Sequence, residues 1–202
     1  SADGYLQWLT FQLRTCPLVE IGSLCGRYTA MDRDKRWERT ERAWKLLVDK
    51  EPEFEAEDAA AGIAAAYARG ETDEFVSPTR LASYHPIAEG DGVLYFNFRA
   101  DRARQLCHAL VHPAFEGFRP KHRPRVKLLT FTAYEKELEP FTAIAYPPQS
   151  LDEILGQIVS EQGWKQFRTA ETEKYAHVTY FFNGGREEPF LGEDRALVPS
   201  PK

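Results

Sequence analysis

The stretch GVLYFNFRADRARQLCHALVH, residues 92–112, decides the fold class of this chain. Its first seven residues, 92–98, form a nearly unbroken apolar run that begins at the Asp91-Gly92 pair. This run indicates a central strand buried on both faces. The residues from Asp101 to about His112 predict a helix, and VKLLTFTA at 126–133 predicts the next strand. Strands that alternate with helices predict an α/β protein, with a central, mostly parallel sheet flanked by helices.

The residues before this stretch add further elements. Apolar residues recur at helical spacing in 3–14 and in 32–49, which predicts two helices. The alanine-rich segment 57–69 predicts a third helix that ends at Gly70. The sequence VEIGSLCG at 19–26 predicts a short buried strand.

Two consecutive prolines after Tyr146 favour an extended connection, and we place a domain boundary there. The sequence SLDE at 150–153 is a capping box, which predicts that a helix begins there and runs to about Gln162. Beyond it we expect strands at 165–169 and 177–182, a helical turn at 172–175, and a tail over 183–202 that is mostly loop. The chain therefore divides into a larger α/β part and a smaller one.

The bulk composition excludes several classes of protein. The net charge of −5 over 202 residues argues against a nucleic-acid-binding protein, which usually carries a basic excess. No apolar run approaches the length of a membrane span, so we expect no membrane partner. The three cysteines, Cys16, Cys25 and Cys107, show no CxxC spacing, which favours a reducing cytoplasm over a disulfide framework.

Arginines occur at two predicted strand ends. Arg27 and Arg33 lie between a predicted strand and a predicted helix, and in open α/β sheets ligands gather beyond the carboxyl ends of strands. A guanidinium group presents a planar fork that fits phosphate or carboxylate. The alternative is that both arginines pair with nearby acids such as Asp32 and Asp34.

A second group follows the apolar strand. Arg99 stands at the end of that strand and Arg102 in the first turn of the next helix, so the two could converge on one anion. The alternative is a surface ion-pair patch with Asp101. Lys174 follows another short strand and could contact a phosphate, whereas the alternative is a solvated lysine beside Thr172 as a helix N-cap.

The sequence motifs do not support a metal site or a nucleotide site. His108 and His112 are four residues apart, but HALVH lacks the glutamate of HExxH and no third ligand is evident, which favours a packed or surface pair. The chain contains no GxSxG, no P-loop and no GxGxxG sequence. These motifs therefore indicate neither a nucleotide site nor a metal site.

Four stretches in their order along the chain resemble the 2,3-bisphosphoglycerate-independent phosphoglycerate mutases. They are GRYTAMDRDKRWER (26–39), DEFVSPT (73–79), LYFNFRADRARQ (94–105) and TAETEKYAHVTYFFNGGREEPFLGEDRALVPSPK (169–202). The resemblance covers nearly the whole chain, and the last stretch is long and specific. Ala100 stands where the family often has proline.

The resemblance implies a domain organisation. Members of the family have a phosphatase-like domain, related to alkaline phosphatases, into which a phosphotransferase domain is inserted. By this comparison residues 1–147 are most of the phosphotransferase domain, incomplete at its N-terminal side. Residues 148–202 are the first part of the returning phosphatase-like domain, so the chain resembles an internal segment of the enzyme.

The resemblance also implies roles for individual residues. Arg27, Arg33, Arg99 and Arg102 bind the substrate from the phosphotransferase domain, and Lys174 reaches it from the phosphatase-like domain. The family's serine nucleophile, the ligands of its two Mn²⁺ ions, and its His-Ser-His and Asp-Gly-Arg-Asp elements are expected outside these residues.

The implied reaction is the interconversion of 3-phosphoglycerate and 2-phosphoglycerate in glycolysis and gluconeogenesis, through a phosphoserine intermediate. It requires no 2,3-bisphosphoglycerate, and the enzyme is expected to be a cytoplasmic monomer. This chain alone is expected to be inactive. Two other hypotheses are a non-catalytic module that binds small anions, and a structural protein whose arginines pair only internally.

Overall fold

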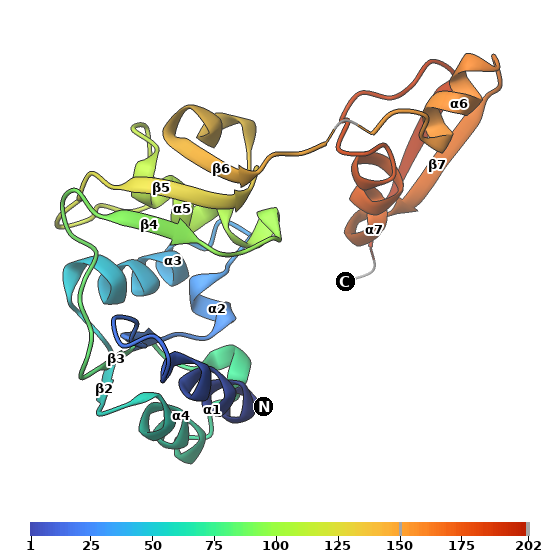
Figure 1. Cartoon of the computed structure of the whole chain (residues 1–202). Helices are drawn as coiled ribbons and strands as arrows, with labels where there is room; N and C mark the ends of the chain where they lie inside the picture. The colour runs from blue at the N-terminus through green and yellow to red at the C-terminus, as the bar shows by residue number, and fades with distance from the viewer. Residues whose placement is uncertain (150, 201–202) are drawn as a thin grey trace. The chain divides into compact units, whose positions relative to one another are not determined.

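The computed structural model describes residues 1–149 and 151–200, which fold into two compact units (Figure 1). The first unit is Ser1–Pro147 and the second is Pro148–Lys202. Each unit contains parallel strands and helices, so the α/β class is confirmed. The strands form three small sheets instead of one central sheet. No described helix combines the length and the apolar character needed to cross a bilayer.

One sheet of the first unit is entirely parallel. It contains β4 (Gly92–Tyr95), β5 (Lys127–Thr132) and β6 (Thr142–Tyr146) in the order β4-β5-β6. In its register Leu94 lies opposite Leu129. The predicted strand at 126–133 is therefore confirmed, and it takes the middle place.

The prediction that residues 92–98 form a central strand buried on both faces is wrong. The strand ends at Tyr95 and pairs only with β5 among the described residues. Val93 and Tyr95 pack against the core, whereas the side chain of Leu94 on the opposite face is 57% exposed. Side chains alternate between the two faces of a strand, and the described residues cover only one face of this sheet.

The main core of this unit lies between the sheet and two helical segments (Figure 1). The 3-10 turn η3 (Ala100–Arg102) and α5 (Arg104–Val111) follow β4. The helix α3 (Trp37–Trp44) continues as a π-helix over Lys45–Asp49. Trp44, fully buried, packs with Leu106 and Leu110 of α5 in one apolar cluster. This packing holds α5, and with it the segment just before α5, in a defined position.

The helix predicted over 32–49 begins at Trp37, five residues late. The Asp32 carboxylate accepts the backbone N–H groups of Asp34 and Arg36, which offers these groups an alternative to helical bonds. Lys35 has φ +58°, which no α-helix contains. Residues 32–36 are therefore a loop, and this loop carries Arg33.

The remaining strands of the first unit form a small mixed sheet. β1 (Ser23–Leu24) runs antiparallel to β3 (Thr79–Leu81), and β2 (Phe54–Ala56) runs parallel to β3. The strand predicted over 19–26 is thus only two residues long, because β3 pairs only with this part of it.

Two of the predicted helices are confirmed beside this sheet. They are α1 (Ala2–Leu13) and α4 (Ala59–Ala68), and α4 ends before Gly70, whose φ is +81°. Leu6 of α1 packs on a small apolar cluster that contains Ile63 of α4. The side chain of Asp58 caps α4 by accepting the backbone N–H of Ala61 at 2.8 Å.

The second unit contains the parallel pair β7 (Gln166–Glu171) and β8 (Glu193–Val198) with helices α6 (Leu155–Glu161) and α7 (Thr172–Ala176). The strand at 165–169 and the helical turn at 172–175 are confirmed. The helix α6 begins after Ile154, since Glu153 has φ +57° and cannot be part of a first helical turn. The first residue of the predicted capping box, Ser150, lies outside the described residues.

Two other predictions for this unit are wrong. Residues His177–Phe181 continue α7 as a π-helix and are not a strand. The tail predicted as mostly loop contains β8, which pairs with β7 over six residue pairs. A strand is stabilised by its partner, and the partner of β8 lies more than twenty residues earlier in the chain.

Candidate functional site

Arg27 is the first residue of the short helix α2 (Arg27–Ala30). Gly26 precedes it and donates its backbone N–H to the carbonyl of Val76 at 2.7 Å. The Arg27 guanidinium binds the Glu74 carboxylate at 3.0 Å, and both side chains are largely exposed. Glu74 belongs to the 3-10 turn η2 (Asp73–Phe75), so Arg27 does not pair with the acids suggested by sequence proximity.

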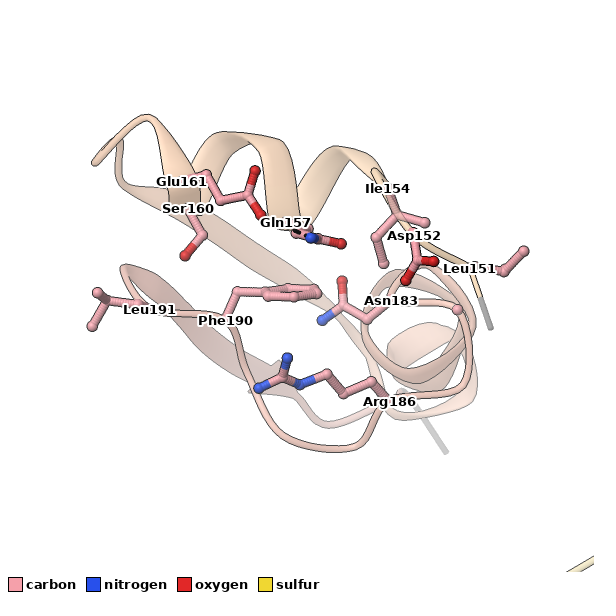
Figure 2. Close-up of a pocket in the computed structure, with 11 residues that line it drawn as sticks. Leu151, Asp152, Ile154, Gln157, Ser160, Glu161, Asn183, Arg186, Phe190 and Leu191 are labelled. Atoms are coloured by element: carbon pink, nitrogen blue, oxygen red, sulfur yellow. Dashed lines mark hydrogen bonds between the residues drawn. The ribbon is translucent and has the colours of Figure 1, made fainter. Parts of the chain in front are cut away.

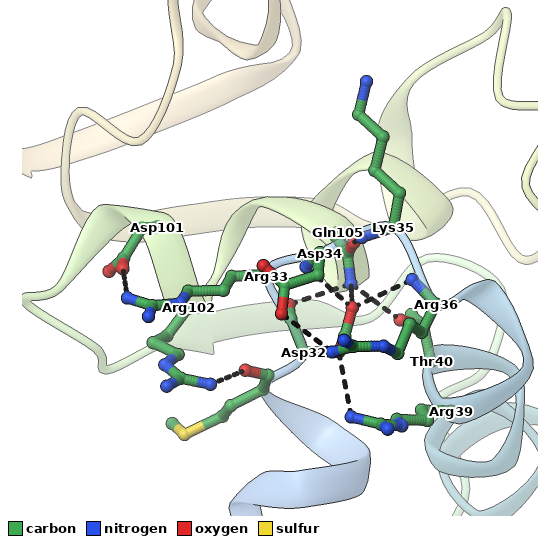
Figure 3. A network of polar contacts seen from close by, with 11 residues as sticks. Asp32, Arg33, Asp34, Lys35, Arg36, Arg39, Thr40, Asp101, Arg102 and Gln105 are labelled. Carbon is green, nitrogen blue, oxygen red and sulfur yellow. Dashed lines mark hydrogen bonds and ion pairs between the residues drawn. The ribbon is translucent and has the colours of Figure 1, made fainter. Parts of the chain in front are cut away.

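Arg33 and Arg99 meet at one carboxylate. Arg33 Nη1 lies 3.2 Å from Asp101 Oδ2 (Figure 3). Arg99 binds the same carboxylate through two bonds, with Nε 2.7 Å from Oδ1 and Nη2 3.0 Å from Oδ2. The structure therefore places two residues, 66 positions apart in sequence, on either side of a single anionic group.

The charge state of Asp101 follows from these contacts. Partial burial alone would raise the pKa of this carboxyl group, but the hydrogen bonds from Arg99 and Arg33 outweigh it and hold the pKa below its ordinary value. Asp101 is therefore a carboxylate at neutral pH. It shows directly that these two guanidinium groups can hold a carboxylate between them.

Arg102 makes a different contact from the other arginines. Its Nη1 donates to the backbone carbonyl of Met31 at 3.0 Å (Figure 3). Met31 follows the last residue of α2 and stands two residues before Arg33. Three of the four predicted arginines, 33, 99 and 102, are thus brought to one junction. Arg27 lies at the other end of α2, which is one helical turn long.

The loop 32–36 is organised by Asp32, a residue that the sequence analysis considered only as a pairing partner. Its carboxylate is buried and accepts four hydrogen bonds (Figure 3). Two come from the backbone N–H groups of Asp34 at 2.9 Å and Arg36 at 3.0 Å, and two from the side chains of Gln105 at 2.9 Å and Arg39 at 3.4 Å. Burial would raise the pKa of Asp32. The hydrogen bonds, first that from Gln105, and the charge of Arg39 instead lower it.

This pKa shift has a consequence for stability. The pKa of Asp32 is lower in the folded chain than its unfolded value of about 3.9, so its contribution is fully present above that value and is lost as the pH falls through the folded-state pKa. We expect Asp32→Asn to lower the free energy of unfolding by about 3 kcal/mol at pH 7, because two of the bonds to this group come from backbone N–H donors that would lose a charged acceptor. The difference from wild type should shrink at pH 3 in urea denaturation.

Asp34→Asn is the matched control for this measurement. The Asp34 side chain is about half exposed and pairs only with Arg36 among the described residues, at 2.7 Å. An exposed pair of this kind contributes about 0–1 kcal/mol, so the control should change little. A gap between Asp32→Asn and wild type that stays constant from pH 7 to pH 3 would contradict the assignment.

A cleft of about 570 Å³ opens beside this junction in the first unit. It is lined by residues of both charges, and those that carry ionisable groups are Arg33, Lys35, Asp101, Arg104, His108, His112, Glu116, Glu135 and Glu137. His108 Nε2 lies 2.7 Å from the Glu135 carboxylate, and its ring packs against that of His112 with centroids 5.0 Å apart. The two histidines are thus a packed pair, as predicted.

No group of three or more His, Cys, Asp or Glu residues within 1–149 and 151–200 has the arrangement needed to hold a metal ion. The two Mn²⁺ ions implied by the resemblance therefore have no fitting ligand set among the described residues.

Lys174 lies in α7 of the second unit, with an exposed side chain. The predicted N-cap, Thr172, is the first residue of α7, and its hydroxyl accepts the backbone N–H of Ser200 at 3.3 Å. A separate cleft of about 530 Å³ occurs in this unit, between α6 and the turn that contains Arg186 (Figure 2). None of the predicted site residues lines that cleft.

The fold and the junction define a class of protein in chemical terms. Guanidinium groups at the end of a parallel strand, with a carboxylate already seated between two of them, are suited to bind small anions that carry carboxylate or phosphate groups. The net charge of the whole chain is negative, so attraction for such an anion has to come from local groups such as these arginines.

Comparison with known proteins identifies the family within this class. Residues 1–136 match the family model described as the N-terminus of the BPG-independent PGAM, so the chain belongs to the 2,3-bisphosphoglycerate-independent phosphoglycerate mutase family. The family is by its name independent of bisphosphoglycerate.

Relatives and a solved structure agree with this assignment. The chain is 51% identical over 202 residues to phosphoglycerate mutases of this kind from Prochlorococcus marinus strain MIT 9303 and Laribacter hongkongensis. The alignments include the whole of this chain but only 37% and 40% of the length of these two relatives. A crystal structure of Leishmania mexicana phosphoglycerate mutase at low cobalt concentration matches with a TM-score of 0.80 and 26% identity, over 100% of this chain and 39% of that one.

Sequence reasoning missed two residues at the junction, Gln105 and the organising role of Asp32. One signal was available for Gln105: it lies three residues after Arg102 and four before the buried Ala109, so it shares a helix face with both. A glutamine on a buried helix face requires polar partners, and the structure supplies them from the loop 32–36.

Proposed function

We propose that this chain forms the substrate-holding part of an enzyme that interconverts 3-phosphoglycerate and 2-phosphoglycerate. Membership of the family supports this proposal, and the relatives that share half of its residues carry the name of that mutase. The chain spans about two fifths of the length of these relatives, so the activity is proposed for the complete enzyme.

The observation that carries the proposal is the carboxylate of Asp101 between Arg33 and Arg99. Phosphoglycerate has both a carboxylate and a phosphate, and each can accept paired hydrogen bonds from a guanidinium group. In this proposal Arg33, Arg99 and Arg102, with Arg27 one helical turn away, hold the glycerate while the phosphoryl group is transferred. Holding the acceptor in place avoids the entropy cost of a bimolecular step.

The finer parts of the proposal follow the resemblance. The first unit would be the phosphotransferase domain, and Lys174 would reach the substrate from the second, phosphatase-like unit. The serine that accepts the phosphoryl group and the ligands of two Mn²⁺ ions would belong to the parts of the relatives beyond the matched region. The enzyme would act as a monomer in the cytoplasm.

A chimera tests this proposal. Residues 1–202 would replace the aligned 202 residues of the Laribacter hongkongensis mutase, which is 51% identical over that length. We expect the purified chimera to convert 3-phosphoglycerate without added 2,3-bisphosphoglycerate, with kcat/KM within about tenfold of the parent enzyme. The coupled assay with enolase follows the product continuously.

A folded chimera that binds its metal ions but shows no mutase activity would contradict the proposal. If such a chimera nonetheless bound 3-phosphoglycerate by calorimetry, the result would favour the module that only binds small anions. The 202-residue chain assayed alone is the control, and we expect no turnover of 3-phosphoglycerate from it.

A further inference from the structure

We propose that Gln105, together with Asp32, is a positioning pair that sets the place of Arg33 in the anion-binding junction. The inference rests on the proposed function, because it assigns these two residues a role in phosphoglycerate binding without contact to the substrate. Neither residue belongs to the set of arginines and Lys174 predicted to touch it.

Gln105 is 6% exposed, and both the nitrogen and the oxygen of its side-chain amide form hydrogen bonds within the protein. Nε2 donates to the Asp32 carbonyl at 2.8 Å, to Asp32 Oδ2 at 2.9 Å and to the Thr40 hydroxyl at 3.2 Å. An amide nitrogen has only two hydrogens, so one of these three bonds is shared. Oε1 accepts the backbone N–H of Lys35 at 2.5 Å. The side chain therefore binds the loop 32–36 near both of its ends (Figure 3).

The loop depends on such outside support. It contains no helical or strand residue, and Lys35 adopts φ +58°, a conformation that costs free energy for any residue other than glycine. Asp32 holds the backbone N–H groups of Asp34 and Arg36, and Gln105 holds that of Lys35. The Asp32 carboxylate is itself buried, and Gln105 supplies one of the bonds that make its burial tolerable.

The arrangement fixes the backbone on both sides of Arg33 and leaves its side chain outside these hydrogen bonds. The clamp acts on the residues before and after Arg33, whereas its guanidinium group is nearly half exposed and lies against Asp101. Three side chains of the short segment 101–105 thus contact residues 31–35. Arg102 binds Met31, Gln105 binds Asp32 and Lys35, and Asp101 binds Arg33. Gln105 belongs to α5, which is packed in the main core. Its hydrogen bonds therefore hold the backbone around Arg33 in a fixed place relative to a rigid helix.

The test is a double-mutant cycle in the chimera with the Laribacter hongkongensis mutase. Gln105→Leu removes all four hydrogen bonds with little change of volume. We expect it to raise KM for 3-phosphoglycerate about tenfold, while kcat changes less than about twofold. Loss of a residue that orients a ligand-binding side chain costs about 10- to 100-fold at metal sites, and we take the lower value. In the Arg33→Ala background the same substitution should change KM by less than about twofold, because the residue through which it acts is gone.

Two further variants protect the test against a folding defect. Gln105→Glu keeps the length of the side chain and the acceptor for Lys35, but loses the donors to Asp32 and adds a charge beside it. It should raise KM in the same direction and should also lose its effect in the Arg33→Ala background. Gln12→Leu, on the exposed helix α1, is the matched control and should leave KM and the thermal midpoint unchanged.

The outcomes separate this inference from the proposed function. If Arg33→Ala itself leaves KM unchanged, Arg33 does not bind the substrate and both proposals lose their support. If Arg33→Ala raises KM but both Gln105 variants raise it by the same factor with and without Arg33, the glutamine acts only on general stability and the positioning role is overturned. A Gln105→Leu or Gln105→Glu effect confined to the background that retains Arg33 supports it.

Discussion

Replacing Arg99 or Arg102 with alanine should lower kcat/KM of the chimeric mutase by about 10- to 100-fold each. A hydrogen bond to a charged group contributes about 1.5–3 kcal/mol, and about 1.4 kcal/mol corresponds to a factor of ten. Arg99 already binds a carboxylate through two parallel bonds, of 2.7 and 3.0 Å, so its geometry suits a bidentate anion. The double variant should lose about 1,000-fold if the two effects add.

The effect of Arg99→Ala on folding should be small, which makes its kinetic result interpretable. The Arg99 side chain is largely exposed, and exposed ion pairs contribute about 0–1 kcal/mol. Arg125→Ala is the matched control, because Arg125 also forms an exposed ion pair, with Glu89 at 2.6 Å, and is not among the candidate site residues. Unchanged kinetics in both Arg99→Ala and Arg102→Ala would remove these residues from the site.

Gly26→Ala should destabilise the first unit by about 3 kcal/mol or more. A Cβ atom at this position would lie 2.3 Å from the carbonyl oxygen of Glu74 and 2.6 Å from the backbone nitrogen of Val76. Both are backbone atoms of the segment that binds Gly26 through its N–H, so neither can turn away as a flexible side chain could. Overpacking of this kind usually costs about 1–3 kcal/mol, and more where only the backbone can yield.

Urea denaturation followed by tryptophan fluorescence measures this effect, since Trp8, Trp37 and Trp44 lie in the first unit and only Trp164 in the second. Gly4→Ala is the control, because a Cβ there meets no atom within 4 Å and Gly4 is inside helix α1. That substitution should leave the free energy of unfolding unchanged or raise it by up to about 1 kcal/mol. A loss below about 1 kcal/mol in Gly26→Ala would show that α2 can move away from residues 74–76.

The same substitution links stability to the candidate site. Gly26 immediately precedes Arg27, and α2 ends just before Met31, whose carbonyl binds Arg102. A shift of α2 would therefore displace one predicted arginine and break the contact of another. From local sequence Gly26 is only the end of a predicted strand, because the close approach of residues 74–76 depends on the tertiary structure.

Elements that depend on local sequence were predicted best. The helices α1 and α4 and the strand β5 occur where periodicity, alanine content and apolar runs indicated them. The errors share a different cause. β8 needed the distant strand β7, and the loop 32–36, which Asp32 forms in place of a helix, is supported by Gln105 about 70 residues later. Such contacts are not encoded in any short window of sequence.

The sequence by itself determined the α/β class, the family resemblance, and the positions of the arginines at the ends of predicted strands. These conclusions depend on residue type and order, which the sequence contains. Only the tertiary structure decided which arginines share an anion: Arg33 and Arg99 meet at Asp101, whereas Arg27 pairs with Glu74 and Arg102 binds a carbonyl. The physical reason is that an ion pair requires a separation of a few ångströms, and the packing of α5 against α3 and the sheet, not the spacing along the chain, determines that separation.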